Sequence, residues 1–296
     1  MNRLLAETNI GLIGVGLMGL GIAKSLRRQG LALSVLDHPG NQPIDDLLAG
    51  GARSYTTPAE VACHSDVIIL CVTGSPQVEQ VINQEAGLLS VPIAGKTIID
   101  CSTAIPGETR KNAAAVAKCG AAFLDAPMTR TPKEAMEGRL NLIVGGEQEV
   151  FERHLALLQC FAENITYAGP VGSGHTLKLL HNFVSIGFSS LLAEAAACSR
   201  ANGVDDGVLL EVLSKGGGAG VILDRFRPFI ECGDDSGFRF SLANSFKDIG
   251  YYRAMTEEAG CPHSVANAVL SFLQKACEDG QAQGSLPGLI DYLARG

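Results

Sequence analysis

Short apolar runs alternate with stretches of helical periodicity from residue 9 to about residue 165. Turns that contain Gly or Pro separate most of these units. This alternation is typical of parallel strands joined by crossover helices. We therefore predict an α/β domain with a doubly wound, mainly parallel sheet over residues 1–168. Its clearest strands are IGLIGV (10–15), LALSVLD (31–37), DVIILCV (66–72), KTIIDC (96–101), AAFLDAP (121–127), NLIVGG (141–146) and NITYAG (164–169).

The hydrophobic pattern changes after Gly169 and Pro170. Residues 175–202 are rich in Leu and Ala and carry no strand signal, which predicts one long helix. Residues 204–215, 248–260 and 264–280 also place apolar residues at helical spacing, and each segment runs into a Gly, a usual helix C-cap. We therefore predict an all-helical (all-α) domain over residues 169–296, joined to the first domain by the long helix.

Composition limits the partners of the chain. Its 296 residues suffice for two domains, and a hydrophobic fraction of 46% can fill their cores. A net charge of −8 offers no Coulomb attraction to nucleic acid or to an anionic membrane. Residues 1–9 have no apolar leader core, and residues 182–198 are too short and polar to span a bilayer. We expect a cytoplasmic protein with a short disordered tail, bound to neither nucleic acid nor membrane.

Nine cysteines occur without a CxxC pair. The odd total and the missing CxxC pair argue for reduced thiols. Most of these residues lie in apolar runs, where free Cys behaves as a small hydrophobic side chain. We expect nearly all of them in the core, and we predict no metal site.

A glycine-rich loop directly follows the first predicted strand and opens a helical run. It reads Gly14-Val15-Gly16-Leu17-Met18-Gly19. In such a loop the first glycine allows a tight turn, the second lets the backbone approach a pyrophosphate, and the third lets helix and strand pack closely. The N–H groups at the helix N-terminus then face the anion. The six residues predict a dinucleotide site in a Rossmann domain.

An acidic residue closes the second predicted strand. Asp37 lies near the offset at which a carboxylate hydrogen-bonds the ribose hydroxyls of NAD. Asp37 would repel a 2′-phosphate, and the next residue, His38, is only a weak cation, so NAD is favoured over NADP. The alternative is that Asp37 only starts the turn that follows.

Three polar side chains converge on the long predicted helix. Lys178 is four residues from Asn182 and three from His181, so all three share a face of an otherwise apolar helix. Partial burial lowers the pKa of a lysine toward neutrality, where it exchanges protons with an alcohol. Lys178 is therefore a candidate acid/base, although a solvated surface lysine fits the same pattern.

Six motifs, in order, resemble the β-hydroxyacid dehydrogenases over nearly the whole chain. They are GLIGVGLMGLGIAKSL, DCST, DAPMTR, EGRLNLIVGG, GSGHTLKLLHN and FKDIG. This family includes 3-hydroxyisobutyrate dehydrogenases and the tartronate semialdehyde and sulfolactaldehyde reductases, and it is related to 6-phosphogluconate dehydrogenase. The resemblance implies a Rossmann domain with an all-helical partner, hydride transfer to or from NAD(P), and a homodimer or homotetramer through the helical domain.

By this resemblance, Lys178 is the catalytic lysine, which takes the hydroxyl proton as hydride leaves the substrate carbon. Asn182 orients the substrate, and Ser102 and Thr103 lie along the nicotinamide and the substrate. For the cofactor, the resemblance implies contacts from Val72, Thr73 and Lys247. Asp248, beside Lys247, is expected to hold its helix in place.

The chain departs from the family at the substrate loop. The common sequence DAPVSGG is replaced by one that ends in Met128, Thr129, Arg130 and Thr131. Thr129 can supply the usual serine hydroxyl, while Arg130 brings a planar cation that suits a sulfonate, phosphate or second carboxylate. We expect a short hydroxy acid or semialdehyde with a strong anionic group, unless Arg130 points to solvent.

His181-Asn182 is similar to the KxxHN pattern of 6-phosphogluconate dehydrogenase. That enzyme has Glu seven residues after the lysine, where this chain has Ser185. The acid that a decarboxylation needs is therefore missing, so we reject the decarboxylating reaction. A sugar-acid substrate that is not decarboxylated stays open as an alternative. Two further alternatives are an imine reductase, which typically lacks the lysine, and a non-catalytic NAD-binding protein.

Overall fold

The computed structural model describes residues 7–238 and 240–294, and β1 begins at Asn9. The predicted tail of residues 1–9 therefore lies largely outside the described residues. The chain divides into two compact units, which meet between Lys178 and Leu179. The predicted boundary at residue 168/169 precedes this point by ten residues, the last six of which belong to the long helix α9 (Ser173–Ala201). The start of α9 is hydrogen-bonded to the first unit, since Asp125 at the end of β6 accepts from the N–H groups of Gly172 and His175.

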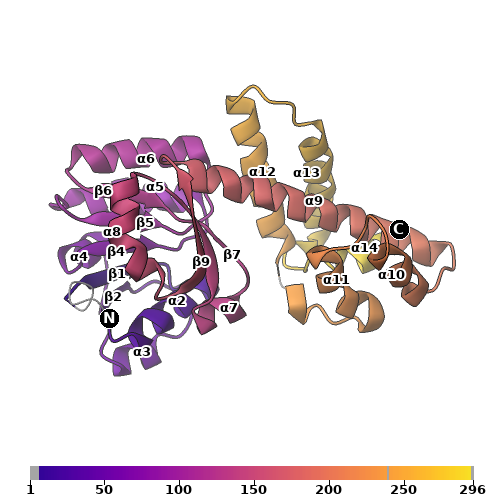
Figure 1. Cartoon of the computed structure of the whole chain (residues 1–296), viewed down its shortest axis with the longest axis horizontal. Coiled ribbons are helices and arrows are strands. Elements are labelled where there is room, and N and C mark those ends of the chain that lie inside the picture. The colour runs from indigo at the N-terminus through magenta and orange to yellow at the C-terminus, as the bar shows by residue number, and fades with distance from the viewer. Residues whose placement is uncertain (1–6, 239, 295–296) are drawn as a thin grey trace. The chain divides into compact units, whose positions relative to one another are not determined.

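The first unit is built on a nine-stranded sheet (Figure 1). Its strand order is β3-β2-β1-β4-β5-β6-β8-β7, with β9 paired to β8, and the strands from β3 to β6 are all parallel. β8 runs antiparallel to both β6 and β7. The strands are β1 (Asn9–Ile13), β2 (Ala32–Leu36), β3 (Arg53–Tyr55), β4 (Val67–Leu70), β5 (Thr97–Asp100), β6 (Ala122–Asp125), β7 (Met128–Thr129), β8 (Leu140–Gly145) and β9 (Ala162–Gly169).

Order 3-2-1-4-5-6 is that of a dinucleotide-binding Rossmann sheet, so the predicted α/β class is confirmed. All seven predicted strands are present. β3 and β7 were not predicted, since RSY and MT are too short to carry an alternating pattern.

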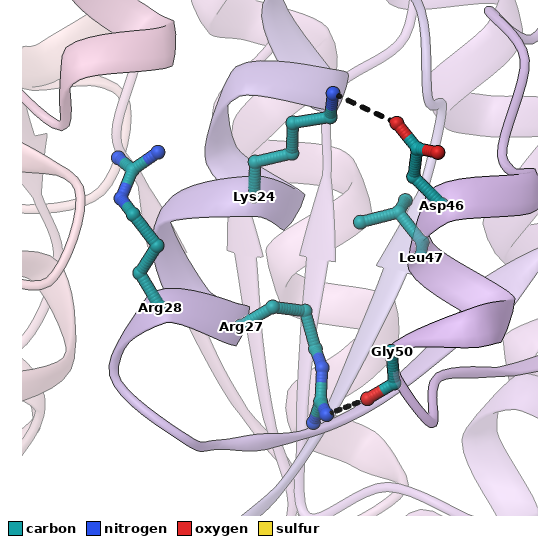
Figure 2. A pocket seen from close by; sticks show the side chains of 6 residues that line it. All are labelled: Lys24, Arg27, Arg28, Asp46, Leu47 and Gly50. Carbon is teal, nitrogen blue, oxygen red and sulfur yellow. Dashed lines mark hydrogen bonds and ion pairs between the residues drawn. The ribbon is translucent and has the colours of Figure 1, made fainter.

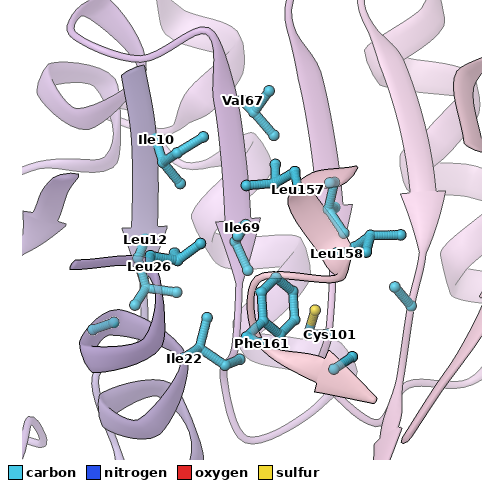
Figure 3. Close-up of a cluster of buried hydrophobic side chains, with 14 of the residues drawn as sticks. Ile10, Leu12, Ile22, Leu26, Val67, Ile69, Cys101, Leu157, Leu158 and Phe161 are labelled. Carbon is cyan, nitrogen blue, oxygen red and sulfur yellow. The ribbon is translucent and has the colours of Figure 1, made fainter. Parts of the chain in front are cut away.

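Helices cover both faces of this sheet. On one face α2, α7 and α8 enclose a core with Ile10, Leu12 and Ile69, part of which Figure 3 shows. On the other face α4, α5 and α6 pack on Ile13, Ile68 and Leu70. Neighbouring strand residues thus enter opposite cores, which is why these strands are continuous apolar runs. The helices are α2 (Leu17–Arg28), α3 (Asp45–Ala49), α4 (Pro58–Cys63), α5 (Ser75–Asn83), η1 (Leu88–Ser90), α6 (Pro106–Lys118), α7 (Pro132–Glu137) and α8 (Gln148–Leu158).

The second unit is helical, as predicted. The C-terminal part of α9 packs with the later helices around Phe226, Ile249 and Leu273, and the rings of Phe183 and Tyr252 stack with centroids 4.1 Å apart. The elements are α10 (Asp206–Ser214), α11 (Val221–Cys232), η2 (Ser236–Phe238), α12 (Leu242–Glu258), α13 (Ser264–Ala276), η3 (Cys277–Gln281) and α14 (Leu289–Ala294). Within the described residues only α9 has the length and hydropathy of a membrane span, and half of that window is buried, as in a core helix.

The expectation for the cysteines is half wrong. All nine are free thiols, as expected. Only Cys101 is buried and five are exposed, because apolar neighbours in the sequence belong to helix faces and turns whose adjacent positions face solvent. The exposed residues are Cys63, Cys119, Cys198, Cys232 and Cys261.

Candidate active site

The glycine loop forms a tight turn between β1 and α2. Gly14 has φ +98°, and a Cβ on it would lie 2.3 Å from the Cys71 carbonyl oxygen. A Cβ on Gly19 would lie 1.9 Å from the Gly14 carbonyl oxygen. A Cβ on Gly16 would meet nothing within 4 Å, so the loop is open at this residue, the N-cap of α2. Packing requires glycine at positions 14 and 19, whereas a side chain at Gly16 would enter open space.

Asn41, in the turn after β2, supports this loop. Its side-chain oxygen accepts from the Val15 N–H at 3.2 Å, and its amide donates to the Leu36 carbonyl at 2.8 Å. Asp37 follows β2 with an exposed side chain, and its N–H donates to the Tyr55 carbonyl. In the turn that follows, the Gly40 N–H donates to His38 Nδ1 at 3.0 Å.

Ser102 lies just beyond β5 and is buried. Its hydroxyl accepts from the Val72 N–H at 3.0 Å, and its own N–H donates to Asp100 Oδ1 at 2.9 Å. The structure thus joins two of the predicted site residues, Val72 and Ser102, at the carboxyl ends of β4 and β5. Thr73 and Thr103 follow them directly in the chain.

Burial raises the pKa of Asp100 and, with Asp100 beside it, raises that of Cys71 to about 12. Burial also raises the pKa of Cys101. Both thiols are therefore protonated at neutral pH and are poor nucleophiles.

The N-terminus of α9 is anchored at the end of β6. Asp125 Oδ1 accepts from the Gly172 N–H and Oδ2 from the His175 N–H, each at 2.8 Å. A Cβ on Gly174 would lie 2.4 Å from the Ile143 carbonyl oxygen and 2.9 Å from Asp125 Oδ2, so this approach requires glycine. Lys178, half-buried, lies one turn further along α9 in the same unit.

The second unit holds three further predicted residues, His181, Asn182 and Lys247, in one cluster with Asp248. The Asn182 amide donates to Asp248 Oδ2 at 2.6 Å, and its oxygen pairs with His181 Nδ1 at 2.9 Å. Lys247 Nζ lies 3.1 Å from Asp248 Oδ1 and 5.4 Å from the centre of the Tyr251 ring. Asp248 thus links α12 to α9 and contacts two predicted site residues, Asn182 and Lys247.

The substrate loop has its own partners in the first unit. Arg130, at φ +81°, donates through Nη1 to the Arg139 carbonyl and to the Glu163 carboxylate. Thr129 accepts from the Asn141 amide at 3.1 Å. Both the N–H and the hydroxyl of Thr131 donate to Glu134, so Thr131 begins α7 as its N-cap.

A hollow of about 350 Å³ lies between α2 and α3 (Figure 2). Lys24, Arg27, Asp46 and Gly50 are among its lining residues. They are paired with one another: Lys24 Nζ is 3.5 Å from Asp46, and Arg27 donates to the Gly50 carbonyl. None of the predicted site residues lines it.

Sequence reasoning gave no role to Asn41, Asp100, Asp125 or His175. Asp100, Asp125 and His175 lie within the family motifs DCST, DAPMTR and GSGHTLKLLHN, so their place in these motifs could have marked them as candidates. The hydrogen-bond partners of Asp125 and His175 are 47 to 73 residues away in the chain, and only folding brings them together.

Residues 9–169 match the family model described as the NAD binding domain of 6-phosphogluconate dehydrogenase. Residues 172–293 match that described as NAD-binding of NADP-dependent 3-hydroxyisobutyrate dehydrogenase. The chain is 35% identical to 2-hydroxy-3-oxopropionate reductase of Escherichia coli over 73% of each chain. It is 31% identical to 3-hydroxyisobutyrate dehydrogenase of Pseudomonas aeruginosa, over 98% of this chain and 99% of the other. The solved Mycobacterium tuberculosis 3-hydroxyisobutyrate dehydrogenase aligns with a TM-score of 0.86 at 22% identity, covering 97% of this chain and 99% of that one.

These matches cover both units and define a two-domain oxidoreductase that uses NAD(P). The chain belongs to the β-hydroxyacid dehydrogenase family, so the predicted family is confirmed.

Proposed function

We propose that the protein interconverts a short anionic 3-hydroxy acid, or a related hydroxy compound, and its semialdehyde or keto form. The observation that carries this proposal is the anchoring of α9 at the carboxyl end of β6, one turn before Lys178. Ligands of Rossmann sheets bind outside these strand ends, where Ser102 and Val72 also lie. The two relatives named above, a 2-hydroxy-3-oxopropionate reductase and a 3-hydroxyisobutyrate dehydrogenase, support a substrate of this class.

Lys178 is the acid/base of the proposed reaction. It accepts the hydroxyl proton in the oxidative direction and returns it in reduction, and its cation stabilises the developing alkoxide. Ser102, His181 and Asn182 orient the substrate, with Asn182 held by Asp248. When bound, NAD(P) supplies or accepts the hydride.

We assign the cofactor to residues 14–19, with Asp37, Val72, Thr73, Thr103 and Lys247. The open space at Gly16 and the helix N-terminus behind it suit a pyrophosphate. The exposed Asp37 carboxylate favours the ribose hydroxyls of NAD over the 2′-phosphate of NADP. NAD is therefore the proposed cofactor, in a cytoplasmic enzyme.

Arg130 is the proposed reader of the second anionic group, with Thr129 and Thr131 beside it in the substrate loop. Its pairing with Glu163 means that a substrate anion must compete with a carboxylate for the guanidinium. Glu163 is about half exposed, so this exchange takes place at the protein surface, where an ion pair contributes less than about 1 kcal/mol. A bidentate sulfonate or phosphate can replace it.

The helical unit is the proposed site of homodimer or homotetramer formation. Leu180, Val184 and Leu191 form an exposed stripe on α9, with Val184 and Leu191 69% and 67% exposed. Val208 and Val212 are likewise exposed one turn apart on α10. A second copy of the chain would remove these side chains from water.

The test is NAD and NADP reduction by the full-length protein against three- and four-carbon hydroxy compounds that carry a carboxylate, sulfonate or phosphate. We expect turnover with NAD, and a fall in kcat of about 10² to 10⁴ in Lys178→Ala with cofactor binding retained. Lys215→Ala is the matched control, because Lys215 is an exposed lysine paired with Glu211 on α10. In Arg130→Gly we expect a higher KM for the best anionic substrate.

Each contrary result has a distinct meaning. Equal kcat in Lys178→Ala and the parent would remove Lys178 from the chemistry. An unchanged KM in Arg130→Gly would remove only the assignment of Arg130. A parent inactive on every hydroxy compound but active on cyclic imines would replace the proposed function by imine reduction.

A further inference from the structure

His175 lies in a buried cluster that the proposed reaction has not used. Its side chain is fully buried in the first turn of α9, between the carboxylates of Asp100 and Asp125. Nε2 is 3.9 Å from Asp100 Oδ2, and Nδ1 is 3.8 Å from Asp125 Oδ2. The two carboxylates end neighbouring strands and stand opposite each other in the β5–β6 register.

The imidazole bridges two segments of the first unit. Nε2 is 3.1 Å from the Ser102 carbonyl oxygen, and Nδ1 is 2.8 Å from the Thr109 hydroxyl on α6. A carbonyl can only accept, so Nε2 carries the proton and donates it to Ser102. His175 therefore links the segment after β5 to the helix that bears Lys178.

Anchoring of α9 does not by itself require this imidazole. Asp125 already binds two N–H groups at the helix N-terminus. An apolar side chain of similar size would fill the same space without placing a polar ring among buried charges. The imidazole adds a directional bond to Ser102. His175 itself lies only three residues before Lys178 in the chain.

We infer that His175 is a positioning residue, which holds the Ser102 segment and the Lys178 turn of α9 in one fixed geometry. This inference rests on the proposed roles of Ser102 and Lys178. Misplacement of a reacting group by about 1 Å can lower a rate on the order of 10²-fold. Loss of the bond from His175 to Ser102 therefore lowers kcat more than it weakens cofactor binding, because residues 14–19 and Asp37, which are assigned to the pyrophosphate and the ribose, lie outside the Ser102 segment.

The experiment compares His175→Leu, His175→Gln and His154→Leu in the full-length protein. Leu removes the donor, while Gln keeps an N–H donor of similar reach. His154 is the matched control, a buried histidine of α8 whose Nδ1 is bound to the Val150 carbonyl of its own helix. We expect kcat to fall at least about tenfold in His175→Leu, with the KM for the cofactor within about twofold of the parent. His175→Gln should recover most of that loss, and His154→Leu should keep the parental kcat.

Hydrogen exchange provides a readout that needs no substrate. In His175→Leu the amides of residues 102–105 and of residues 173–178 should both exchange faster than in the parent, whereas His154→Leu should leave both unchanged. A parental kcat in His175→Leu, an equal kcat loss in His154→Leu, or faster exchange in only one segment would overturn the inference while the proposed function stands. A parent without turnover would instead overturn the proposed function, and this inference with it.

Discussion

Asp100 is a buried carboxyl that the fold leaves incompletely paired. Oδ1 accepts from the Ser102 N–H, whereas Oδ2 has no hydrogen-bond partner among the described residues. Burial raises the pKa of Asp100 above its ordinary value of 3.8, and Asp125 adds to the rise, while His175 and Ser102 oppose it. The folded protein therefore binds this proton more tightly than the unfolded chain does. Ionisation of Asp100 lowers stability as the pH rises above that ordinary value.

We predict that Asp100→Asn raises the free energy of unfolding at pH 7 by about 1 kcal/mol, since it removes a buried charge and keeps the acceptor for Ser102. The gain should shrink as the pH falls, because protonation of Asp100 in the parent removes the same buried charge. Urea unfolding at several pH values measures this difference. Asp125→Asn is the control and should be destabilising, because both oxygens of Asp125 accept from N–H groups. A gain that does not depend on pH would exclude ionisation as its cause.

At the scale of the element, the turn from β1 into α2 separates packing from ligand binding. A Cβ on Gly14 or Gly19 would overlap the backbone carbonyl of Cys71 or Gly14, whereas a Cβ on Gly16 would meet nothing within 4 Å. The three glycines of one motif therefore fulfil different physical requirements.

Gly19→Ala and Gly16→Ala should consequently fail in different ways. In Gly19→Ala the Cβ meets the Gly14 carbonyl, and we expect a loss of stability of about 1 to 3 kcal/mol. In Gly16→Ala we expect parental thermal stability and an affinity for NAD that is weaker by about tenfold, because the methyl group occupies the pyrophosphate side. Thermal unfolding and NAD titration distinguish the two. Unchanged NAD affinity in Gly16→Ala would place the pyrophosphate elsewhere.

At the scale of the whole molecule, the α9 stripe of Leu180, Val184 and Leu191 bears on assembly. We predict that Val184→Glu combined with Leu191→Glu shifts the protein to a monomer, since a charge within an apolar interface is strongly unfavourable. Sedimentation or light scattering measures the mass. Leu48→Glu on α3 is the control, an exposed leucine of the first unit, and should leave the mass unchanged. A monomeric parent would contradict the proposed assembly.

Much of this architecture could be predicted from local patterns. The apolar run Val67–Leu70 forms a strand that is buried on both faces, and the Leu- and Ala-rich stretch forms α9. Both could be predicted because continuous apolar runs and helical periodicity are patterns of residues close in sequence. Short elements were missed for the opposite reason. Met128–Thr129 becomes a strand only through pairing with Leu142 and Asn141 on β8.

The residue types of the candidate site could likewise be predicted, since a glycine loop and a lysine among apolar residues are local patterns. The hydrogen-bond and ion-pair partners of these residues could not be predicted. Arg130 looked like a pocket cation, yet its guanidinium is paired with Glu163, which lies 33 residues further along the chain. Five of the nine cysteines are exposed to solvent, although most of the nine lie among apolar residues in the sequence. Local sequence thus dictated the strands, the long helix and the chemistry available, while the pairing and burial of each polar group arose only in the folded chain, because hydrogen-bond partners and dielectric surroundings come from residues distant in sequence.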